Sequence, residues 1–368
     1  MCEHGSLKIA VVKRRPTTHE ENAPLVEGRN RDLSVPLERF VFRVEDDEDG
    51  LRLDHALMDR IHWRSRSDLQ ARIRRGGVLV NEQPAKASRR LQAGDEIAVL
   101  IRPEDLPDQD PARVPLSVLH EDEQVIVLDK APGVLVHPIG RHVLDTLVNA
   151  LWLRFKRSGE AARGAEPHVV QRLDRNTSGV LVLAKTRVAK KALQDVFENR
   201  RAQKTYLAWV EGGPEADTGS IRAPLARDRD GEIRIRMKVD PAGAPSHTEF
   251  EVLERHADAS LVRFHLHTGR QHQIRVHAAH LGHPLLTDPL YGDPRDVGVE
   301  GDLEPRLRRQ ALHAERLVLP HPSGHGELDI QAPLPDDLSS LGEGLREGLG
   351  LKRFEDRQSG AWIVRRGH

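Results

Sequence analysis

Cysteine, aromatic residues and long apolar runs are all scarce in this sequence. Cys2 is the one cysteine among 368 residues, which excludes an internal disulfide framework and a thiolate-rich zinc site and fits a reducing compartment. No apolar run approaches the roughly 18–20 residues of a membrane span, and the first residues lack the charged-then-apolar pattern of a signal peptide. We therefore expect a soluble cytoplasmic protein without a membrane partner.

The net charge is also close to zero, because the chain has 56 Lys and Arg residues and 57 Asp and Glu residues. The whole-chain charge therefore gives no argument for nucleic-acid binding. The charges are unevenly distributed along the chain, however. The segment between Arg52 and Gln92 has ten Lys or Arg residues and only four Asp or Glu residues. A local surplus of arginine suits a phosphate backbone, since each neutralised phosphate releases counterions. The same surplus is also typical of a solvated helix face.

Composition divides the chain into five segments. Residues 1–38 mix charges, Pro and Thr without periodicity, and we expect them to be flexible. Residues 39–102 show two short helices followed by strands, and the Pro- and Asp-rich stretch 103–115 is the best linker candidate. Residues 116–335 alternate strands with a few helices, and residues 336–368 read as a polar tail.

Periodicity and turn residues locate several elements within these segments. Ser67 is a plausible N-cap for the second helix of the basic segment, which the Gly76–Gly77 pair ends. Two apolar strands are expected on either side of the Pro132–Gly133 turn. Farther along, a helix from Gln271 carries an apolar stripe formed by Ile274, Ala278 and Leu281.

The stretch VVQRLDRNTSGVLVLAKT, residues 169–186, places one carboxylate among cations. Two apolar, strand-like runs flank a polar hinge in which Asp174 lies between Arg172 and Arg175. The Asn, Thr, Ser and Gly that follow are ordinary turn residues. The hinge alone therefore fits a structural turn as well as it fits a reactive carboxylate.

The segment HTGRQHQIRVHAAHLGHP, residues 267–284, concentrates basic groups at the start of a helix. Cations are favoured at the other end of a helix dipole, so an anion is expected nearby, and Asp174 is the obvious candidate. A metal site is the alternative for the histidines, but no carboxylate or thiolate stands at ligand spacing. We therefore expect hydrogen bonds to backbone or RNA, and no metal, for His272, His277, His280 and His283.

The basic segment carries a first resemblance to a known family. RLDHALMDRIHWRSRSDLQARIRRGGVLVNEQ, with the later GDEIAV, resembles the small RNA-binding domain of the ribosomal protein S-four type. An R-L-D start, an S-R helix, a G-x-V-x-V-N strand and a G-D turn stand here in the order of that family. The resemblance implies structured RNA as the ligand, with phosphate contacts from Arg66, Arg72, Arg74 and Arg75.

The chain from about residue 118 to 322 resembles the RluA-type pseudouridine synthases. QRLDRNTSG matches the first motif of that family, which implies that Asp174 is the catalytic residue. KTY implies an active-site aromatic at Tyr206, and TGRQHQIRVHAAHLGHPLLTDPLYG implies that Arg275 pairs with the aspartate. Two positions depart from the His and the Thr that the family usually has, namely Gln171 and Gln271.

This resemblance implies an α+β catalytic domain, with a mixed, mostly antiparallel sheet and flanking helices, preceded by the small α/β RNA-binding domain. It implies that uridine in structured RNA is isomerised to pseudouridine, which needs no cofactor or metal. Large-subunit ribosomal RNA is the expected substrate, transfer RNA is the alternative, and the enzyme is expected to be a monomer. A non-catalytic RNA-binding or ribosome-assembly protein and a metal-dependent hydrolase using the histidines are the competing hypotheses.

The reaction explains why these residue types are needed. Breaking the glycosidic bond leaves the sugar carbon electron-poor, so an ionised carboxylate is required beside it. Burial raises the pKa of a carboxyl group and a guanidinium lowers it again, and we expect Arg275 to do this for Asp174. Attack on the sugar carbon and removal of a sugar proton both remain open. Tyr206 is expected to stack on the detached uracil. Contacts with the RNA around the flipped-out base are expected from Arg172, Lys204 and Arg270.

Overall fold

The computed structural model describes residues 39–61, 65–101, 108–139, 142–229, 231, 233, 235–300 and 306–354. These residues form two compact units that divide between residues 109 and 110, with Ile139 and residues 142–143 belonging to the first unit. The expected flexible segment 1–38 and the first part of the expected linker lie outside the described residues. No helix in the described part of the chain is long and apolar enough to cross a membrane.

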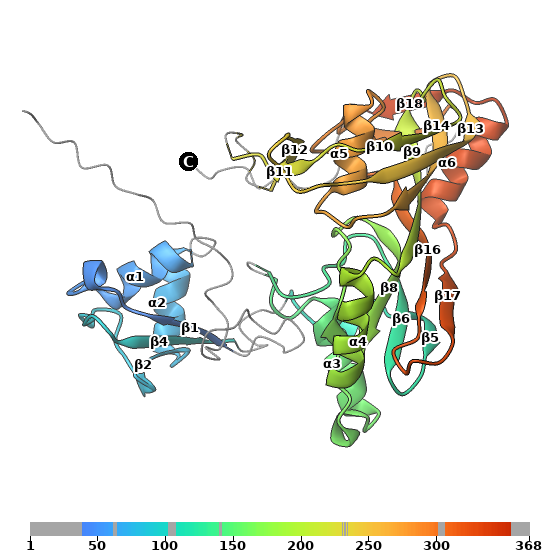
Figure 1. Ribbon diagram of the computed structural model, residues 1–368. Helices are drawn as coiled ribbons and strands as arrows, with labels where there is room; N and C mark the ends of the chain where they lie inside the picture. Colours follow the sequence, from blue (N-terminus) through green and yellow to red (C-terminus); the bar gives the residue numbers. More distant parts are fainter. Residues whose placement is uncertain are drawn as a thin grey trace, which may run out of the picture. The chain divides into compact units, whose positions relative to one another are not determined.

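The first unit is a small sheet that carries two helices (Figure 1). Apolar side chains at helical spacing, such as Leu53 and Leu57 on the first helix, pack against the strands in one core. Its elements are β1 (Arg39–Arg43), α1 (Leu53–Arg60), α2 (Arg66–Arg74), β2 (Val78–Val80), β3 (Gln83–Pro84) and β4 (Glu96–Leu100). The strands are antiparallel and follow the order β1-β4-β2-β3.

Helix α2 begins at Arg66, earlier than a cap at Ser67 would allow. The hydroxyl of Ser65 accepts a hydrogen bond from the backbone N–H of Asp68 at 3.2 Å, so Ser65 is the N-cap. The prediction of Ser67 as the N-cap is therefore wrong. The physical reason is that a capping hydroxyl bonds the amide two or three residues farther on, and Ser65 stands at that spacing from Asp68.

A buried carboxylate joins the two helices of this unit. Asp54 on α1 is 0% exposed and accepts hydrogen bonds from Arg66 Nη2 at 3.0 Å and from Gln70 Nε2 at 2.8 Å, both on α2. A further bond comes from Arg52 at 3.0 Å. The bonds from Arg52 and its neighbours outweigh burial and hold the pKa of Asp54 well below its usual range. The R-L-D and S-R patterns of the sequence thus meet in one ion-pair network.

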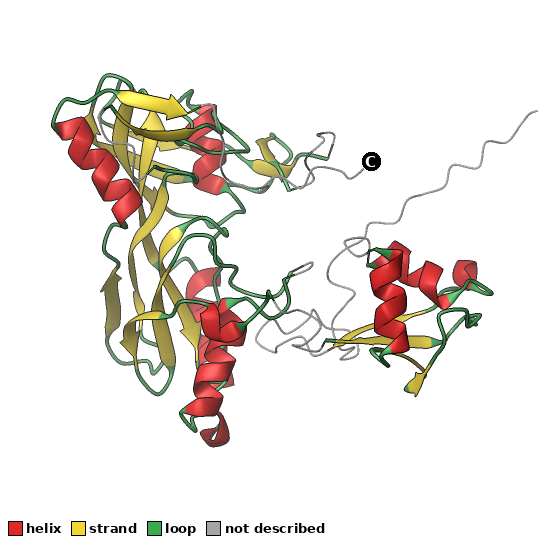
Figure 2. Ribbon diagram, turned by 180° about the vertical axis from the view of Figure 1, so that it is seen from behind, coloured by secondary structure: helices red, strands yellow, loops and turns green. Residues whose placement is uncertain are grey.

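The second unit is built on one long sheet, whose strands are yellow in Figure 2. The strands follow the order β10-β13-β14-β9-β16-β8-β6-β5, while β17 pairs with β16 and β7 pairs with β8. All pairings are antiparallel except for a short parallel contact between β16 and β8. The predicted mixed, mostly antiparallel sheet is confirmed. The strands are β5 (Ser117–Glu121), β6 (Val125–Lys130), β7 (His168–Val169), β8 (Ser178–Ala184), β9 (Gln203–Glu211), β10 (Thr218–Ile221), β13 (Thr248–Arg255), β14 (Ala259–Leu266), β16 (Leu312–Pro320) and β17 (Glu327–Gln331).

Strand alternation decides which face of this sheet each helix covers. Helix α3 (Leu147–Arg157) packs with Ile126, whereas α4 (Arg187–Glu198) packs with Val127, so these helices lie on opposite faces of β6. On β9, α5 (Gln273–His280) packs with Ala208, whereas α6 (Asp336–Arg346) packs with Trp209. These two helices therefore lie on opposite faces of β9. Two short antiparallel pairs complete the unit, β11 (Leu225–Arg227) with β12 (Met237–Val239) and β15 (Asp296–Val299) with β18 (Leu351–Phe354).

One row of register partners crosses the middle of the sheet. Lys130 on β6 lies opposite Gly179 on β8, and Gly179 lies opposite Ala314 on β16. Ala314 in turn lies opposite Tyr206 on β9, which faces Phe264 on β14. Directly opposed residues share a face, so this row brings segments far apart in the sequence to one place.

Two local predictions in this unit are wrong. Only the first of the two strands expected around the Pro132–Gly133 turn forms, because the chain after the turn meets another loop, with an isolated bridge between Leu135 and Thr146. The apolar stripe of α5 is shorter than predicted. The helix ends at His280, which leaves Leu281 past its last turn and 37% exposed.

The prediction of a polar tail from residue 336 is wrong for residues 336–354. These residues form α6 and β18, and residues 355–368 lie outside the described part. Leu338, Leu341 and Leu345 are buried in one cluster with Trp209. Their three- and four-residue spacing is an amphipathic helix signal that the surrounding acidic residues and glycines obscured.

The α6 contact yields the first prediction. Leu341 is 4% exposed, so we expect Leu341→Ala to lower the free energy of unfolding of the second unit by about 2–5 kcal/mol, through lost burial and a residual cavity. Val188→Ala on α4 is the control, because Val188 is 78% exposed and its truncation should cost less than about 0.5 kcal/mol. Urea unfolding followed by circular dichroism measures both. Equal midpoints for the two variants would contradict a packed α6.

Candidate active site

Asp174 lies in the turn between β7 and β8, and hydrogen bonds to backbone carbonyls hold this turn in place. Nζ of the buried Lys130 donates to the carbonyl oxygen of Arg175 at 2.8 Å and to two carbonyls of the loop after β6. Arg175 itself donates from Nε to the carbonyl of Gly133 at 2.8 Å. Burial lowers the pKa of Lys130 to about 7. The cation that follows Asp174 in the sequence therefore serves to position the turn.

Gly179 allows β8 to approach β16 behind this turn. Its φ of +107° is disfavoured for residues with a side chain. A Cβ atom at this position would collide with the backbone carbonyl of Ala314. The glycine of the T-S-G sequence is thus required by the parallel strand contact next to the candidate site.

Arg309 links the same turn to helix α6. Its Nη1 donates to the carbonyl oxygen of Asn176 at 3.1 Å, and its Nε and Nη2 form a bidentate pair with Asp337 at 2.7 and 2.8 Å. Arg309 is buried, so this contact is shielded from water. The segment predicted as a tail thereby contributes to holding the Asp174 turn.

Arg275 on α5 lies between two carboxylates. Its Nη1 donates to Asp174 Oδ2 at 3.0 Å, which is the contact that the sequence predicted. Its Nε and Nη2 form a bidentate pair with Asp288 at 2.7 and 2.8 Å. Asp288 is 0% exposed and also accepts the backbone N–H groups of Leu290 and Tyr291. Arg275 is therefore clamped on one side and presents its remaining edge to Asp174.

The charges around Asp174 keep its carboxylate ionised. Burial raises the pKa of Asp174, but the positive charge of protonated His272, the charge of Arg275 and the hydrogen bond from Arg275 more than offset this, so the pKa lies below its usual value. Burial lowers the pKa of the adjacent His272, whose ring is therefore neutral near pH 7 and leaves Arg275 as the balancing cation. The side chain of Asp174 is nevertheless 26% exposed. An anion that is both paired and accessible is what the proposed chemistry needs.

Tyr206 and Lys204 both lie on β9. Tyr206 is 9% exposed, in the same apolar cluster as Ile274 of α5. Burial and the negative charge of Asp174 raise the pKa of Tyr206, so its hydroxyl stays protonated. The ammonium of Lys204 lies beside Gly269, and burial lowers its pKa. Their roles towards RNA remain predictions.

The loop before α5 is fixed by a glutamine. Gln273 Oε1 accepts hydrogen bonds from the hydroxyl of Thr268 at 2.8 Å and the backbone N–H of Arg270 at 3.0 Å. The side chain of Arg270 is exposed, as are those of Gln271 and Arg172, whereas Gln171 is half-buried. Exposure makes Arg172 and Arg270 accessible to RNA, and their contact with it remains a prediction.

The four predicted phosphate contacts of the first unit differ in their surroundings. Arg66 is bonded to Asp54, and Arg72 Nη1 donates to the carbonyl oxygen of Leu100 at 2.7 Å, so both also serve the fold. Arg74 and Arg75 are exposed at the end of α2. We therefore expect Arg74 and Arg75 to give the more direct measure of RNA binding.

Among the four predicted histidines of the α5 segment, His277 and His283 bond to protein groups, and His280 is exposed. His277 is 0% exposed, with Nδ1 2.8 Å from Thr248 Oγ1 and Nε2 2.9 Å from the carbonyl of Ala223. His283 Nδ1 lies 2.9 Å from the carbonyl of Glu211. His277 and His283 thus make the hydrogen bonds to backbone that we expected in place of metal ligation.

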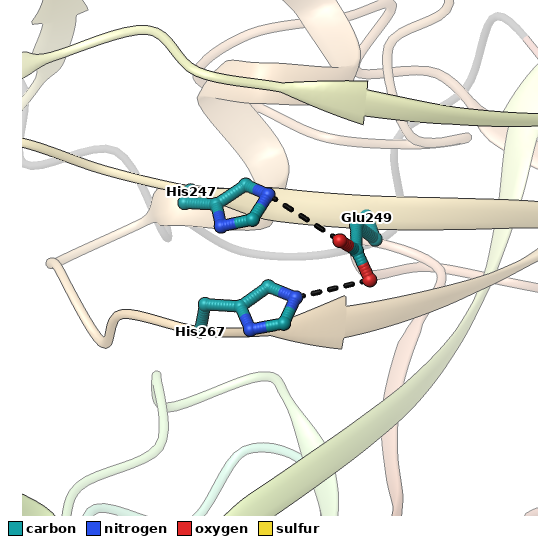
Figure 3. Close-up of side chains that lie close together, drawn as sticks. All are labelled: His247, Glu249 and His267. Carbon is teal, nitrogen blue, oxygen red and sulfur yellow. Dashed lines mark ion pairs between the residues drawn. The ribbon is translucent and has the colours of Figure 1, made fainter.

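A different group of possible ligands, missed from the sequence, lies on β13 and at the end of β14. Among the described residues, His247, Glu249 and His267 place their ligand atoms within 4.8 Å of one another. Each Nε2 faces one oxygen of Glu249, at 3.6 Å from His247 and 3.0 Å from His267 (Figure 3). The rings are stacked at 4.1 Å and 10°, so these nitrogens point side by side. His247 Nε2 also lies 2.9 Å from the hydroxyl oxygen of Ser220, whereas His267 Nε2 is within hydrogen-bond distance of Glu249, so both nitrogens already have a protein partner.

Comparison with known proteins agrees with the site. Residues 124–280 match the family model for RNA pseudouridylate synthase, and residues 51–97 match the model for the S4 domain. The chain is 38% identical over 304 residues to the ribosomal large subunit pseudouridine synthase D of Nitrosomonas europaea, covering 82% of this chain and 87% of the relative. It is 35% identical to the uncharacterized RNA pseudouridine synthase YlyB of Bacillus subtilis, covering 83% of this chain and 97% of the relative.

A solved structure supports the same assignment. The human RNA pseudouridylate synthase domain containing 4 is 25% identical, with a TM-score of 0.50, and the match covers 64% of this chain and 94% of that chain. The chain belongs to the RluA-type family of RNA pseudouridine synthases, which are isomerases, and it carries an S4 domain in front of the synthase domain. Both family resemblances found in the sequence are confirmed.

Sequence reasoning missed three residues that position the site. Lys130 and Arg309 bind the Asp174 turn through backbone carbonyls, and Asp288 binds Arg275. Asp288 stands in the D-P-L-Y pattern after the α5 segment, but nothing in the spacing of the sequence indicated that Arg275 is its partner. A buried cation that bonds carbonyl groups leaves no complementary residue in the sequence to signal it.

The clamp on Arg275 yields the second prediction. We expect Asp288→Ala to lower the free energy of unfolding by about 3–5 kcal/mol, because it leaves part of a buried guanidinium unpaired. Asp329→Ala is the matched control, since it removes a partner of Arg316 in an Arg–Asp pair whose side chains are about half exposed. Chemical denaturation of both variants measures this. The clamp has no structural importance if the two substitutions have the same small effect.

Proposed function

We propose that this synthase isomerises uridine in large-subunit ribosomal RNA, with Asp174 as its catalytic residue. The observation that carries the assignment of the residue is the accessible Asp174 carboxylate paired with the buried Arg275. The RNA substrate is supported by the relative from Nitrosomonas europaea, whose name specifies the large ribosomal subunit and most of whose length this chain covers.

The geometry suits each step of the isomerisation. The bond between the sugar carbon and N1 of uracil breaks, and its electron pair leaves with the base. The Asp174 carboxylate supplies negative charge to the electron-poor sugar carbon. The base turns, its C5 atom bonds to the same sugar carbon, C5 loses its proton, and N1 gains one. Atoms and electrons balance without an oxidant, a reductant or a co-reactant, so no cofactor is proposed.

The remaining predicted residues take roles around this reaction. Tyr206 stacks on the detached uracil while it turns, which its buried position beside Asp174 supports. Arg172 occupies the gap left in the RNA by the flipped base, and Lys204 and Arg270 bind the flanking phosphates. Asp174, Tyr206 and Arg275 come from one chain, which supports action as a monomer. A ribosomal RNA substrate supports a cytoplasmic location.

The third prediction tests the catalytic carboxylate. RNA labelled with tritium at C5 of uracil releases tritium when the new bond forms, and we expect Asp174→Asn to lower this release by at least about 10²–10³-fold, because the amide carries no charge. Asp329→Asn makes the same chemical change at the partner of an exposed ion pair and should release tritium at the wild-type rate.

Three measurements separate the competing functions. Absence of tritium release from any cellular RNA by the wild-type enzyme would support a non-catalytic RNA-binding protein. Hydrolysis that a chelator stops would support a metal-dependent hydrolase. Chemical mapping of pseudouridine in ribosomal and transfer RNA from a strain lacking the gene tests the substrate, and loss confined to transfer RNA contradicts the ribosomal assignment.

The fourth prediction concerns the S4 domain. We expect Arg74→Ala combined with Arg75→Ala to weaken RNA binding and to reduce the slope of log affinity against log salt by about 1 per lost phosphate contact. Arg43→Ala on β1 is the control, because Arg43 is also exposed but lies outside α2. Filter binding at several salt concentrations measures all variants. An unchanged slope in the double variant excludes these two arginines as phosphate contacts.

A further inference from the structure

His272 is held in a strained conformation beside the catalytic carboxylate. It stands at the N-cap of α5 with φ +55° and ψ +20°, a left-handed conformation that is uncommon outside glycine. Its side chain is only 7% exposed. Residues in such conformations persist where the surrounding structure imposes them, and they are frequent at functional sites. The conformation turns the ring of His272 towards both Tyr291 and Asp174.

Tyr291 determines which nitrogen of His272 carries the proton. The backbone N–H of Met237 donates to the Tyr291 hydroxyl oxygen at 2.8 Å, so the hydroxyl proton is free to be donated onward. His272 Nδ1 lies 2.8 Å from the same oxygen, which allows Nδ1 to accept the hydrogen bond of that hydroxyl. Burial raises the pKa of Tyr291 to about 12, so the phenol keeps its proton. A neutral imidazole that accepts at Nδ1 must carry its hydrogen on Nε2.

The Nε2–H group faces Asp174 without being bonded to it. His272 Nε2 lies 3.9 Å from Asp174 Oδ2, which is beyond hydrogen-bond distance. Among the residues that the structure describes, the bond to Tyr291 is the one hydrogen bond of this ring. A donor is therefore fixed next to the reacting carboxylate and remains available to a ligand.

Asp288 aligns this donor with the Arg275 pair. Asp288 Oδ1 accepts the backbone N–H of Tyr291 at 3.2 Å and also pairs with Arg275 Nη2. The guanidinium carbon of Arg275 lies 5.2 Å from the centroid of the Tyr291 ring. One buried carboxylate thus positions both the cation that ionises Asp174 and the phenol that orients His272.

We propose that His272 is a second catalytic residue, whose Nε2–H donates a hydrogen bond to a carbonyl oxygen of the departing uracil, with Tyr291 as the positioning residue. The inference rests on the proposed function. When the bond between the sugar and N1 breaks, the electron pair passes to the uracil ring and its negative charge spreads to the carbonyl oxygens. A preorganised donor stabilises that charge. His272 transfers no proton and ends the reaction unchanged.

The neutrality of His272 is part of this role. An imidazolium would be drawn to Asp174 and would compete with the sugar for the carboxylate. A neutral donor avoids this competition and still bonds an oxygen that becomes negative. Arg275 supplies the ion pair and His272 supplies the hydrogen bond, so the two neighbours of Asp174 have separate tasks.

The fifth prediction compares two substitutions of His272 by tritium release. We expect His272→Leu, which removes the donor, to lower kcat by about 10²-fold while KM for RNA changes less than about threefold. His272→Gln is the matched variant, because its amide N–H can reach the position of Nε2–H, and it should recover at least about tenfold of the lost kcat. Tyr291→Phe should lower kcat with KM unchanged. A wild-type kcat in His272→Leu overturns the proposal.

A spectroscopic measurement tests the tautomer independently of turnover. In the full chain labelled with ¹⁵N-histidine, we expect the His272 signals, assigned by their loss in His272→Gln, to show a protonated Nε2 and an unprotonated Nδ1. In Tyr291→Phe the two nitrogens should move towards each other in chemical shift. A protonated Nδ1 in the wild type overturns the proposal even if His272→Leu fails to fold. An inactive wild-type enzyme instead refutes the proposed function, and the tautomer is still measured.

Discussion

The site depends on one guanidinium that is divided between two carboxylates. Arg275 makes two short bonds to the fully buried Asp288 and one longer bond to the accessible Asp174. The bidentate bond fixes the orientation of the guanidinium, because a planar fork has few ways of satisfying both oxygens. The single bond leaves Asp174 oxygen atoms available for substrate. Because Arg275 makes two bonds to Asp288 and one to Asp174, Asp288 has a structural role and Asp174 remains available to react.

The turn that carries Asp174 is both a structural turn and a reactive one. The backbone N–H of Thr177 donates to the carbonyl oxygen of Asp174 at 3.1 Å and closes the turn, whereas Ser178 and Gly179, expected in the turn, already belong to β8. Gly179 there allows the close approach of β16. Lys130 and Arg309 hold the same turn through its carbonyl groups. Backbone bonds of this kind fix the position of a side chain without using the side chain itself. The carboxylate is therefore placed accurately and remains free to react.

The sequence predicted those parts of the site that lie within contiguous motifs. Asp174, Tyr206 and Arg275 each stand in a recognisable segment, and the Asp174–Arg275 contact is the one that the family resemblance implied. The sequence also predicted the fold class and several strands, because strands buried on both faces, such as β8, read as continuous apolar runs bounded by turn residues. Its failures have local causes. The Ser65 cap depended on a helix start that two neighbouring serines made ambiguous.

Tertiary partners explain the other failures. The expected strand after Gly133 is replaced by a loop whose carbonyls bond to Lys130, and no local pattern signals such a bond. Helix α6 was hidden by its acidic and glycine residues, although its leucines are buried against Trp209. The role of Asp288 required knowledge of the distance to Arg275. Each of these features is set by a group that is remote in the sequence or leaves no pattern in it.

The order of the strands has a consequence for synthesis of the protein on the ribosome. Strand β16 lies between β9 and β8, so it joins two halves of the sheet that are translated long before it. Until residues 312–320 leave the exit tunnel, β8 with the Asp174 turn and β9 with Tyr206 have no common neighbour. Late closure of non-local pairings is slow, since loop entropy is lost before contacts form. We therefore expect the catalytic site of a nascent chain to form only after β16 is inserted, whereas the S4 domain, a separate unit, is translated well before it.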